Sequence, residues 1–273
     1  MAGQDENPGG IPDGVNAAVP NGARIYDYML GGKDNYEADR RAADQMIAAN
    51  PAAPLTAQAN RGFLGRAVRH LAADRGIRQF IDIGAGLPTQ QNVHQVAQAA
   101  APGSRVVYAD YDPVVVAHAD ALLATTDHVR VIKGDLRRPR EILGDPGTRA
   151  LLDFTEPVAV LLVAILHFIG PDEDPHGIVA SLRDALPSGS HLVVSHTVSD
   201  SPDEVMAAAQ RGFRASGAPL TPRTRAEIER FFDGFDLIEP GLADVRTWRA
   251  DDAPADLPDL PWTMVGAVGR LRP

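Results

Sequence analysis

Short runs of apolar and β-branched residues alternate with helical stretches from residue 79 to residue 269 of the chain. This alternation is typical of a parallel sheet whose strands are joined by crossover helices, because strands buried on both faces need apolar residues throughout. Helices are expected between the runs, at 89–100, 113–124 and 172–186, and Thr224 and Glu227 have the spacing of a capping box. The sequence therefore predicts an α/β protein with strands at 79–83, 105–109, 129–133, 158–163, 191–195, 236–238 and 263–269.

The chain ahead of the first predicted strand divides into two parts. Residues 1–20 are rich in Gly, Pro, Asn and Asp and have almost no bulky apolar residues, so we expect a disordered arm. Residues 21–76 have helical periodicity, with Phe63, Leu64 and Val68 among the recurring apolar residues, and predict an N-terminal helical cap. Residues 77–273 would then form the α/β domain, and we expect the cap and this domain to make one compact unit.

The first predicted strand leads directly into a glycine-containing turn with the sequence Ile81-Asp82-Ile83-Gly84-Ala85-Gly86. Glycines at these two positions allow the backbone to turn sharply and to approach a ligand where a Cβ atom would clash. A Gly-x-Gly pair also occurs in ordinary turns between a strand and a helix. The turn by itself is therefore only weak evidence for a nucleotide site.

Two further acids follow the second and third predicted strands. Asp110 comes 24 residues after the second glycine of the turn, the spacing at which a carboxylate reaches the ribose hydroxyls in nucleotide-binding folds, and Tyr111 is its neighbour. Asp135 could accept a hydrogen bond from an adenine amine, while Leu136 covers the ring. Each acid alone could be an ordinary turn or helix cap. Together with Asp82 they predict a ligand site, because open α/β sheets bind ligands at the carboxyl ends of their strands.

The same turn also indicates which nucleotide is bound. Pro88 lacks an amide hydrogen, and Thr89 stands where a dinucleotide fingerprint has a third glycine, so the turn is a poor phosphate cradle. A phosphate-free nucleoside such as S-adenosylmethionine fits better, because its ammonium and sulfonium groups favour an acidic neighbourhood around Asp82. We therefore favour a methyl-donor site, with a nicotinamide-dependent oxidoreductase as an alternative.

Several longer motifs resemble those of one protein family. They are ARIYDYMLGGKDN at 23–35, NRGFL at 60–64, RQFIDIGAGLP at 78–88, VYADYDPV at 107–114 and GSHLVVSH at 189–196. Residues 78–200 resemble class I S-adenosylmethionine-dependent methyltransferases in general. Nearly the whole chain after residue 20 resembles an actinomycete S-adenosyl methyltransferase family once described only as a domain of unknown function. The resemblance implies a class I, Rossmann-like fold with seven strands, S-adenosylmethionine as cofactor and methyltransferase activity, but it names no acceptor.

The sequence departs from the general class I pattern at Pro88 and at Ala164, a position we expect at the cofactor site and where many relatives carry a polar or acidic residue. The usual acidic candidate for a base is therefore absent. His167 and His196 follow the fourth and fifth predicted strands and are our candidate bases, because histidine titrates near neutral pH. Either could instead be structural. Arg61 could meet the donor carboxylate, although an arginine on a helix more often lies at the surface.

A polar and aromatic segment of the predicted cap surrounds a Gly-Gly pair at 31–32 and is a candidate lid over the donor or the acceptor. The alternative is a helix C-cap followed by an ordinary turn. The candidate lid and substrate residues are Tyr26, Tyr28, Lys33, Asp34 and Asn35.

Composition and charge exclude several other functions. The formal net charge of −10 disfavours nucleic-acid binding, and there is no cysteine for a thiolate site. The histidines lack the spacing of metal ligands, and the longest apolar run, at 158–166, is too short to cross a bilayer. We therefore expect a cytoplasmic enzyme without a metal, acting on a small-molecule methyl acceptor, with its oligomeric state left open. A non-catalytic regulatory protein that binds S-adenosylmethionine is the alternative.

Overall fold

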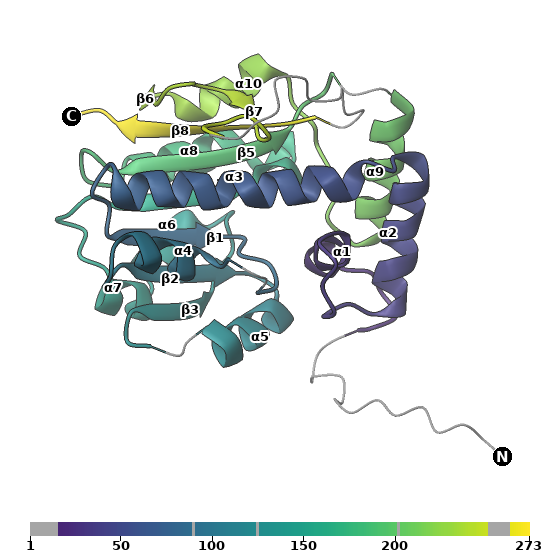
Figure 1. Cartoon of the computed structure of the whole chain (residues 1–273), viewed down its shortest axis with the longest axis horizontal. Helices are drawn as coiled ribbons and strands as arrows, with labels where there is room; N and C mark the ends of the chain where they lie inside the picture. The colour runs from purple at the N-terminus through teal and green to yellow at the C-terminus, as the bar shows by residue number, and fades with distance from the viewer. Residues whose placement is uncertain (1–15, 89–90, 124–125, 201–202, 251–262) are drawn as a thin grey trace.

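The computed structural model describes residues 16–88, 91–123, 126–200, 203–250 and 263–273 (Figure 1). Most of the predicted disordered arm, and Thr89 of the turn, lie outside these residues. The described part of the arm, residues 16–20, makes specific contacts, since the carbonyl oxygen of Val19 accepts a hydrogen bond of 2.7 Å from Arg24. The end of the predicted arm is therefore attached to the first helix.

A mixed sheet forms the centre of the molecule and confirms the predicted α/β fold. Its strand order is β3-β2-β1-β4-β5-β8-β6, with β7 paired to β8. Strands β1 to β5 are parallel, and β8 is antiparallel to β5, β6 and β7. The strands are β1 Gln79–Ile83, β2 Arg105–Asp110, β3 Val129–Lys133, β4 Ala159–Val163, β5 His191–Thr197, β6 Phe235–Leu237, β7 Ala243–Asp244 and β8 Met264–Leu271.

Seven of these strands agree with the predicted runs to within two residues at either end. The eighth, β7, has only two residues, too few for a periodic pattern in the sequence. The five residues of β1 and the seven of β5 are all buried, including polar residues at the ends of both strands, as expected for central strands covered on both faces.

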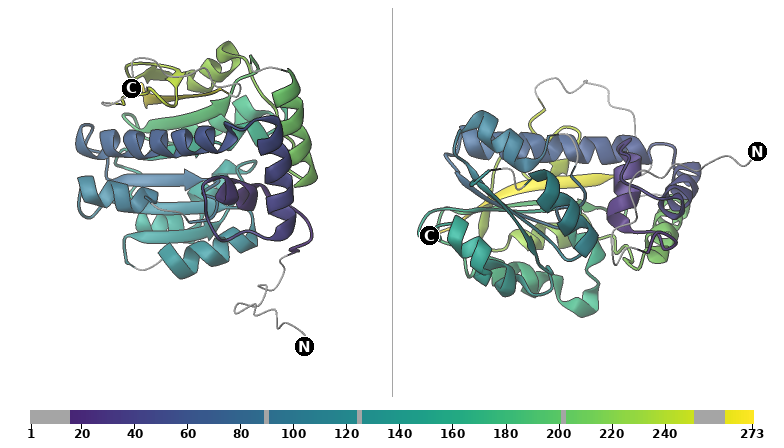
Figure 2. Two further views of the ribbon diagram at one scale, coloured as in Figure 1. Left: turned by 45° about the vertical axis from the view of Figure 1, so that its right-hand side comes forward. Right: turned by 90° about the horizontal axis from the view of Figure 1, so that it is seen from below.

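Helices cover both faces of the sheet (Figures 1 and 2). One face packs against α3, α4 and α5, and the other packs against α6, α7, α8, α10 and the short helix η3. The helices are α1 Gly22–Met29, α2 Glu37–Ala49, α3 Ala53–Ala73, α4 Val93–Ala100, α5 Pro113–Leu123, α6 Pro139–Gly144, α7 Pro146–Leu151, α8 Pro175–Arg183, α9 Asp203–Ala215 and α10 Arg225–Glu229, with 3-10 helices η1 Leu166–Phe168, η2 Pro171–Glu173 and η3 Arg230–Phe232. Among the described residues, no helix is both long and apolar enough to cross a bilayer.

The predicted capping box is confirmed, whereas the helix predicted at 89–100 begins only at Val93, after its cap Asn92. Thr224 caps α10 and accepts a hydrogen bond of 3.3 Å from the amide of Glu227, as its spacing predicted. The predicted helix at 172–186 is divided, because Asp174 adopts a left-handed backbone conformation between η2 and α8.

The predicted N-terminal cap divides between two parts of the structure. The C-terminal part of α3 belongs to the sheet layer, where Phe63 and Leu71 are fully buried beside Phe80 of β1. Helices α1 and α2 instead pack with α9 around a separate apolar cluster that includes Met46 and Phe213. These three helices lie together at one end of the sheet (Figure 2).

A buried ion pair joins the first two helices. Arg24 of α1 donates a hydrogen bond of 2.7 Å to Asp39 of α2, and both side chains are at most 5% exposed. The carboxylate of Asp39 also accepts from the backbone amides of Asn21 and Tyr36, each at 2.8 Å. These contacts fix the orientation of α1 at the end of the sheet.

Candidate active site

A pocket of about 270 Å³ lies at the carboxyl ends of β1 to β4 and beneath α1, α3, η1 and α9. The strand order reverses between β1 and β4 at this point, which is where open α/β sheets form ligand crevices. We call its two walls the strand-end side and the helical side. The strand-end side comprises Asp82, Gly84, Ala85, Gly86, Asp110, Tyr111, Asp135 and Leu136, and the helical side comprises Tyr26, Met29, Leu30, Asn60, His167, Phe168 and Phe213.

The glycine turn after β1 adopts a conformation that requires glycine. Gly84 has a φ of 74° and Gly86 a φ of 65°, both in the left-handed region. The amide of Gly84 donates to the carbonyl oxygen of Ala109 at 2.8 Å, and a Cβ atom at position 84 would lie 2.6 Å from the side chain of Ile165. The turn is therefore in contact with both β2 and the loop after β4.

Asp110 ends β2 and is held in the pocket by backbone amides. Its carboxylate accepts hydrogen bonds of 3.0 Å from the amides of Gly86 and Asp112. The residue is 7% exposed, and burial raises the pKa of Asp110 to about 6 although these amide hydrogen bonds lower it. A second buried acid with a raised pKa lies nearby.

That acid is Asp82, which lines the pocket and is 5% exposed. Burial raises the pKa of Asp82 to about 7, and the charge of Asp110 adds to the increase, while Arg61 opposes it. Arg61 also lines the pocket, and its buried Nε has no hydrogen-bonding partner among the described residues. Arg61 therefore contributes to the pocket wall, while its Nη2 donates to the carbonyl oxygen of Gln91 and to Oδ1 of Asn92, each at 3.3 Å.

The remaining predicted residues of the strand-end side are also in the pocket wall. Asp135 accepts from the amide of Arg137 at 3.0 Å, and its side chain is 24% exposed. Leu136 is buried and Ala85 is partly buried, and both line the pocket. Tyr111 is 50% exposed and lies at the edge of the pocket. All eight residues predicted for this side are therefore brought together.

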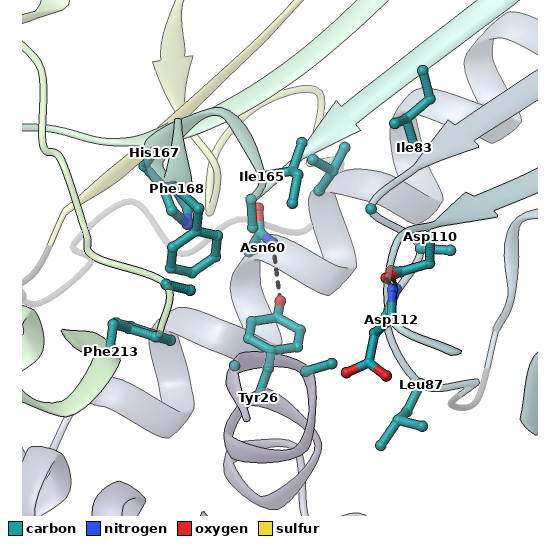
Figure 3. A pocket seen from close by; sticks show the side chains of 18 of the residues that line it. Tyr26, Asn60, Ile83, Leu87, Asp110, Asp112, Ile165, His167, Phe168 and Phe213 are labelled. Carbon is teal, nitrogen blue, oxygen red and sulfur yellow. Dashed lines mark hydrogen bonds between the residues drawn. The ribbon is translucent and has the colours of Figure 1, made fainter. Parts of the chain in front are cut away.

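Ala164 begins a hydrogen-bonded chain that crosses to the helical side. It has a φ of 56°, and its amide donates to the Oγ of Ser195 at 3.0 Å. That hydroxyl donates to the Oδ1 of Asn60 at 2.6 Å, and the Nδ2 of Asn60 donates to the hydroxyl of Tyr26 at 2.9 Å (Figure 3). The Tyr26 hydroxyl donates in turn to the carbonyl oxygen of Ala57 at 3.1 Å, and burial raises the pKa of Tyr26.

His167 lies on η1 and forms part of the helical side, next to Phe168 (Figure 3). The residue is 4% exposed, and its Nδ1 has no hydrogen-bonding partner in the described part of the chain. Burial, with smaller effects from His196 and Arg223, lowers the pKa of His167 well below its usual value. The ring is therefore neutral at pH 7.

The other candidate base, His196, does not line the pocket. It is fully buried, its Nδ1 is 2.7 Å from the carbonyl oxygen of Thr197, and its Nε2 is 2.8 Å from Nη1 of Arg223. Since the carbonyl and the guanidinium fix Nδ1 as donor and Nε2 as acceptor, the lone pair of the ring is already used. Burial lowers the pKa of His196 to about 3. The geometry does not support His196 as a base.

His196 instead belongs to a support beneath η1. Arg223 also donates to the carbonyl oxygens of Leu166 and Ile169, at 2.9 and 2.7 Å. These two carbonyl groups bracket His167 in sequence. His196 and Arg223 therefore position the loop that carries His167, a role that the sequence did not reveal.

Only one of the five candidate lid residues lines the pocket. Tyr26 does so, whereas the hydroxyl of Tyr28 bonds to Asp44 at 3.1 Å, outside the pocket. Lys33 and Asp34 are exposed, and the Nδ2 of Asn35 donates to Asp27 at 2.9 Å. The segment consists of helix α1 and the turn that follows it, the alternative stated above.

The structure adds pocket residues that the sequence did not single out. Phe168 and Phe213 come from η1 and α9 and lie 4.9 Å apart between ring centroids. Asn21 donates a hydrogen bond of 2.5 Å to Asp112, which connects the start of α1 to the loop after β2. These contacts join segments that are distant in sequence, so no local sequence pattern predicted them. Asn60 lies in the motif at 60–64, but the sequence assigned it no role.

The pocket fits the cofactor that the sequence predicted. Two buried acids with raised pKa values favour a ligand with positive charge, the glycine turn permits close approach, and Pro88 leaves the turn without one amide for a phosphate. Among the described residues, no group of three or more His, Asp or Glu side chains could hold a metal ion. These features suit the nucleoside and the cationic groups of S-adenosylmethionine.

Comparisons with known proteins agree with this fit. The family model described as S-adenosyl methyltransferase matches residues 9–272. The chain is 44% identical to a DUF574 family protein from Streptomyces avermitilis, with a TM-score of 0.88 over 93% of this chain and 98% of that one. It is 41% identical to a putative methyltransferase from Thermobifida fusca, with a TM-score of 0.90 over 96% of this chain and 98% of that one.

More distant similarity supports the fold alone. Human N-acetylserotonin methyltransferase, solved in complex with S-adenosylmethionine, is 13% identical, with a TM-score of 0.51 over 93% of this chain and 63% of that one. A search of curated proteins finds no significant match. Because the family model and both close structures extend over nearly the whole chain, this protein belongs to the S-adenosyl methyltransferase family.

Proposed function

We propose that the protein transfers a methyl group from S-adenosylmethionine to a small, largely apolar molecule that carries a hydroxyl or amine group, and that His167 accepts the proton of this group. The observation that carries the proposal is His167 itself. Its ring lies in the pocket wall, is neutral at pH 7, and has a free Nδ1.

The strand-end side is the proposed donor site. Asp110 would accept hydrogen bonds from the ribose hydroxyls, Asp135 and Leu136 would contact the adenine, and Asp82 would face the cationic part of the donor. Gly84, Ala85 and Gly86 would lie along the nucleoside, with Tyr111 at the edge and Ala164 beyond the turn. Arg61, with its free Nε, would hold the donor carboxylate.

The helical side is the proposed acceptor site. Met29, Leu30, Phe168 and Phe213 give it an apolar and aromatic surface. Such a surface would bind an apolar acceptor and exclude water from the reacting groups. Helix α1 covers this side through Tyr26, and the proposed lid role is restricted to this helix.

When bound, S-adenosylmethionine supplies a methyl group on a sulfonium, and transfer to a hydroxyl or amine acceptor leaves S-adenosylhomocysteine and releases one proton. Most of the catalysis comes from alignment and from the exclusion of water. His167 would take up the proton at its free ring nitrogen. Arg223 and His196 would hold the loop in place through the carbonyl oxygens of Leu166 and Ile169.

The test uses methyl-labelled S-adenosylmethionine with the small-molecule fraction of a cell extract. Wild-type protein should transfer label to a small solute, and His167→Ala should lower kcat by about 10²- to 10⁴-fold. Affinity for S-adenosylhomocysteine should stay within about twofold, because His167 lies on the helical side. His128 is exposed and outside the pocket, so His128→Ala is the matched control.

Added imidazole separates a chemical role from a structural one. It should restore part of the activity of His167→Ala if the ring acts as a base, since it can occupy the space left by the side chain. Unchanged kcat in His167→Ala would remove the proposed base but leave the transferase. If the wild-type protein binds S-adenosylhomocysteine but labels neither solutes nor macromolecules, the non-catalytic alternative replaces the proposal.

A further inference from the structure

A second cleft lies at the amino ends of the parallel strands, on the side of the sheet opposite to the pocket at their carboxyl ends. It is formed where β1, β2 and β5 begin and where β8 ends, and it has a volume of about 690 Å³. Gln79 and Arg105 are the first residues of β1 and β2, whereas the donor site is formed after these strands end. The methyl-transfer proposal makes no use of this cleft.

The cleft carries an excess of positive charge in an acidic protein. Four arginines line it, Arg75, Arg78, Arg105 and Arg270, against two acids, Asp74 and Glu156. Within the described ranges, no carboxylate lies within 4.0 Å of any of the four guanidinium groups. The whole chain, in contrast, has a formal net charge of −10.

The hydrogen bonds of Arg78 and Arg105 go to uncharged backbone carbonyl groups, so they leave the positive charge of these side chains unpaired. Arg78 donates to the carbonyl oxygens of Ala72 and Ile77, at 2.7 and 3.0 Å, and Arg105 donates to that of Leu151 at 2.9 Å. These contacts hold the two guanidinium groups in place while leaving other N–H groups free. An arginine fixed in this way loses little further entropy when it binds an anion.

A buried histidine provides an independent sign of a ligand. His191 lines the cleft and is 3% exposed, and within the described ranges its ring has no polar contact other than one with the backbone of Gly189. Buried polar atoms nearly always have a partner, so a ring nitrogen left without one needs an explanation. Burial and the charges of Arg270 and Arg75 lower the pKa of His191 to about 4. The ring is thus neutral at pH 7 and has one N–H to donate.

We propose that this cleft binds the phosphate group of a small molecule, held by Arg270, Arg105 and His191. A tetrahedral anion offers acceptors in several directions, which suits donors that converge from the starts of two strands and the end of a third. A nucleic acid is disfavoured because the positive charge is confined to one cleft of an acidic chain. Since the two sites lie at opposite edges of the sheet, phosphate and the methyl donor should bind without competition.

The test is a titration of the full chain with inorganic phosphate, followed by calorimetry, in the presence of saturating S-adenosylhomocysteine. We expect saturable binding that Arg270→Gln and Arg105→Gln each weaken by about tenfold or more. Arg272→Gln is the matched control, because Arg272 is an exposed arginine directly after the same strand, is paired with Asp236 at 2.7 Å, and lies outside the cleft. This variant should bind phosphate like the wild-type protein.

Ring proton shifts of His191 give a second measurement that does not depend on a variant. They should move with phosphate in the wild-type protein. Tighter binding of a phosphate monoester such as AMP than of inorganic phosphate would identify a phosphorylated molecule as the ligand, and equal affinity would identify the free ion. Absence of saturable binding, or equal weakening by Arg272→Gln and Arg270→Gln, would overturn the proposal.

Discussion

The two sides of the pocket are built in different ways. The strand-end side uses residues 82–136, in which three successive strands place an acid or a glycine turn at the same edge of the sheet. The helical side joins segments from Tyr26 to Phe213, and a chain of hydrogen bonds through Asn60 and Ser195 connects it to the sheet. Sheet pairing fixes the first side, whereas the second depends on how helices pack beyond the sheet. The helical side can therefore change without disturbing the donor site.

The strongest test of this difference breaks the ion pair that holds the helical side together. Arg24→Leu leaves the carboxylate of Asp39 buried without its partner, and should lower the free energy of unfolding of this region by about 3–5 kcal/mol. Hydrogen exchange should speed up in α1 and α2 while the amides of β1 and β4 remain protected.

A second ion pair serves as the control for this experiment. Arg41 and Glu37 lie on α2, and their side chains are 68% and 74% exposed. Arg41→Leu should therefore change stability by less than about 0.5 kcal/mol. Uniform loss of protection across the whole chain in Arg24→Leu would mean that the two sides form one cooperative unit, contrary to the comparison.

The next largest effect should come from the strand-end side. Asp110→Ala removes the carboxylate that faces the pocket and is held by the amides of Gly86 and Asp112. We expect about 100-fold weaker binding of S-adenosylmethionine and S-adenosylhomocysteine, because hydrogen bonds to a charged group are lost. Calorimetry measures both affinities, with Asp236→Ala, an exposed acid outside the pocket, as the control. Unchanged affinity would show that the nucleoside binds elsewhere.

The pH dependence of the donor site should be a smaller effect, in which stability and donor affinity change in opposite directions as pH rises. Burial raises the pKa of Asp82 to about 7, so the folded state holds a proton on this residue that the unfolded state has already lost. Asp82 therefore makes the ligand-free protein less stable as pH rises from about 4 to about 7. Affinity for cationic S-adenosylmethionine should instead rise by about fivefold to tenfold between pH 6 and pH 8, as the carboxylate ionises.

Both trends should be measured as differences between the wild-type protein and Asp82→Asn. Buried histidines such as His191 and His196 have lowered pKa values and change stability in the opposite direction at acid pH. The variant keeps these groups and removes only the titration of Asp82. Parallel pH profiles in the two proteins would contradict the assignment.

The smallest effect should come from the hydrogen bonds between the two sides. Tyr26→Phe leaves the Nδ2 of Asn60 and the carbonyl oxygen of Ala57 without this hydroxyl and should cost about 1 kcal/mol in urea unfolding. Donor affinity should not change. Tyr28→Phe, which loses an exposed hydrogen bond to Asp44, should cost less than Tyr26→Phe, and equal costs would show that the Tyr26 network adds nothing.

The same comparison explains what the sequence could predict. Strands and their terminal acids are local in sequence, so β1 to β3 and the residues from Asp82 to Leu136 followed from periodicity and spacing. The partners of His196 could not be predicted, because Arg223 is 27 residues away and meets it only through tertiary packing. Four of the five candidate lid residues do not line the pocket, and the sequence could not show this because the direction of each side chain depends on how α1 packs. Phe213 had no signal beyond the apolar face of its helix.

The position of β8 affects the order in which the sheet can be completed during synthesis. This strand lies between β5 and β6, yet it begins at Met264, long after β5 ends at Thr197. Strands β1 to β5 can pair as they leave the ribosome. The edge of β5 that pairs with β8 in the finished protein stays unpaired until β8 has been made. An unpaired strand edge is prone to pair with other chains. The nascent protein therefore passes through a stage in which the donor site can already form. At this stage the unpaired edge of β5 also makes the chain most prone to aggregation.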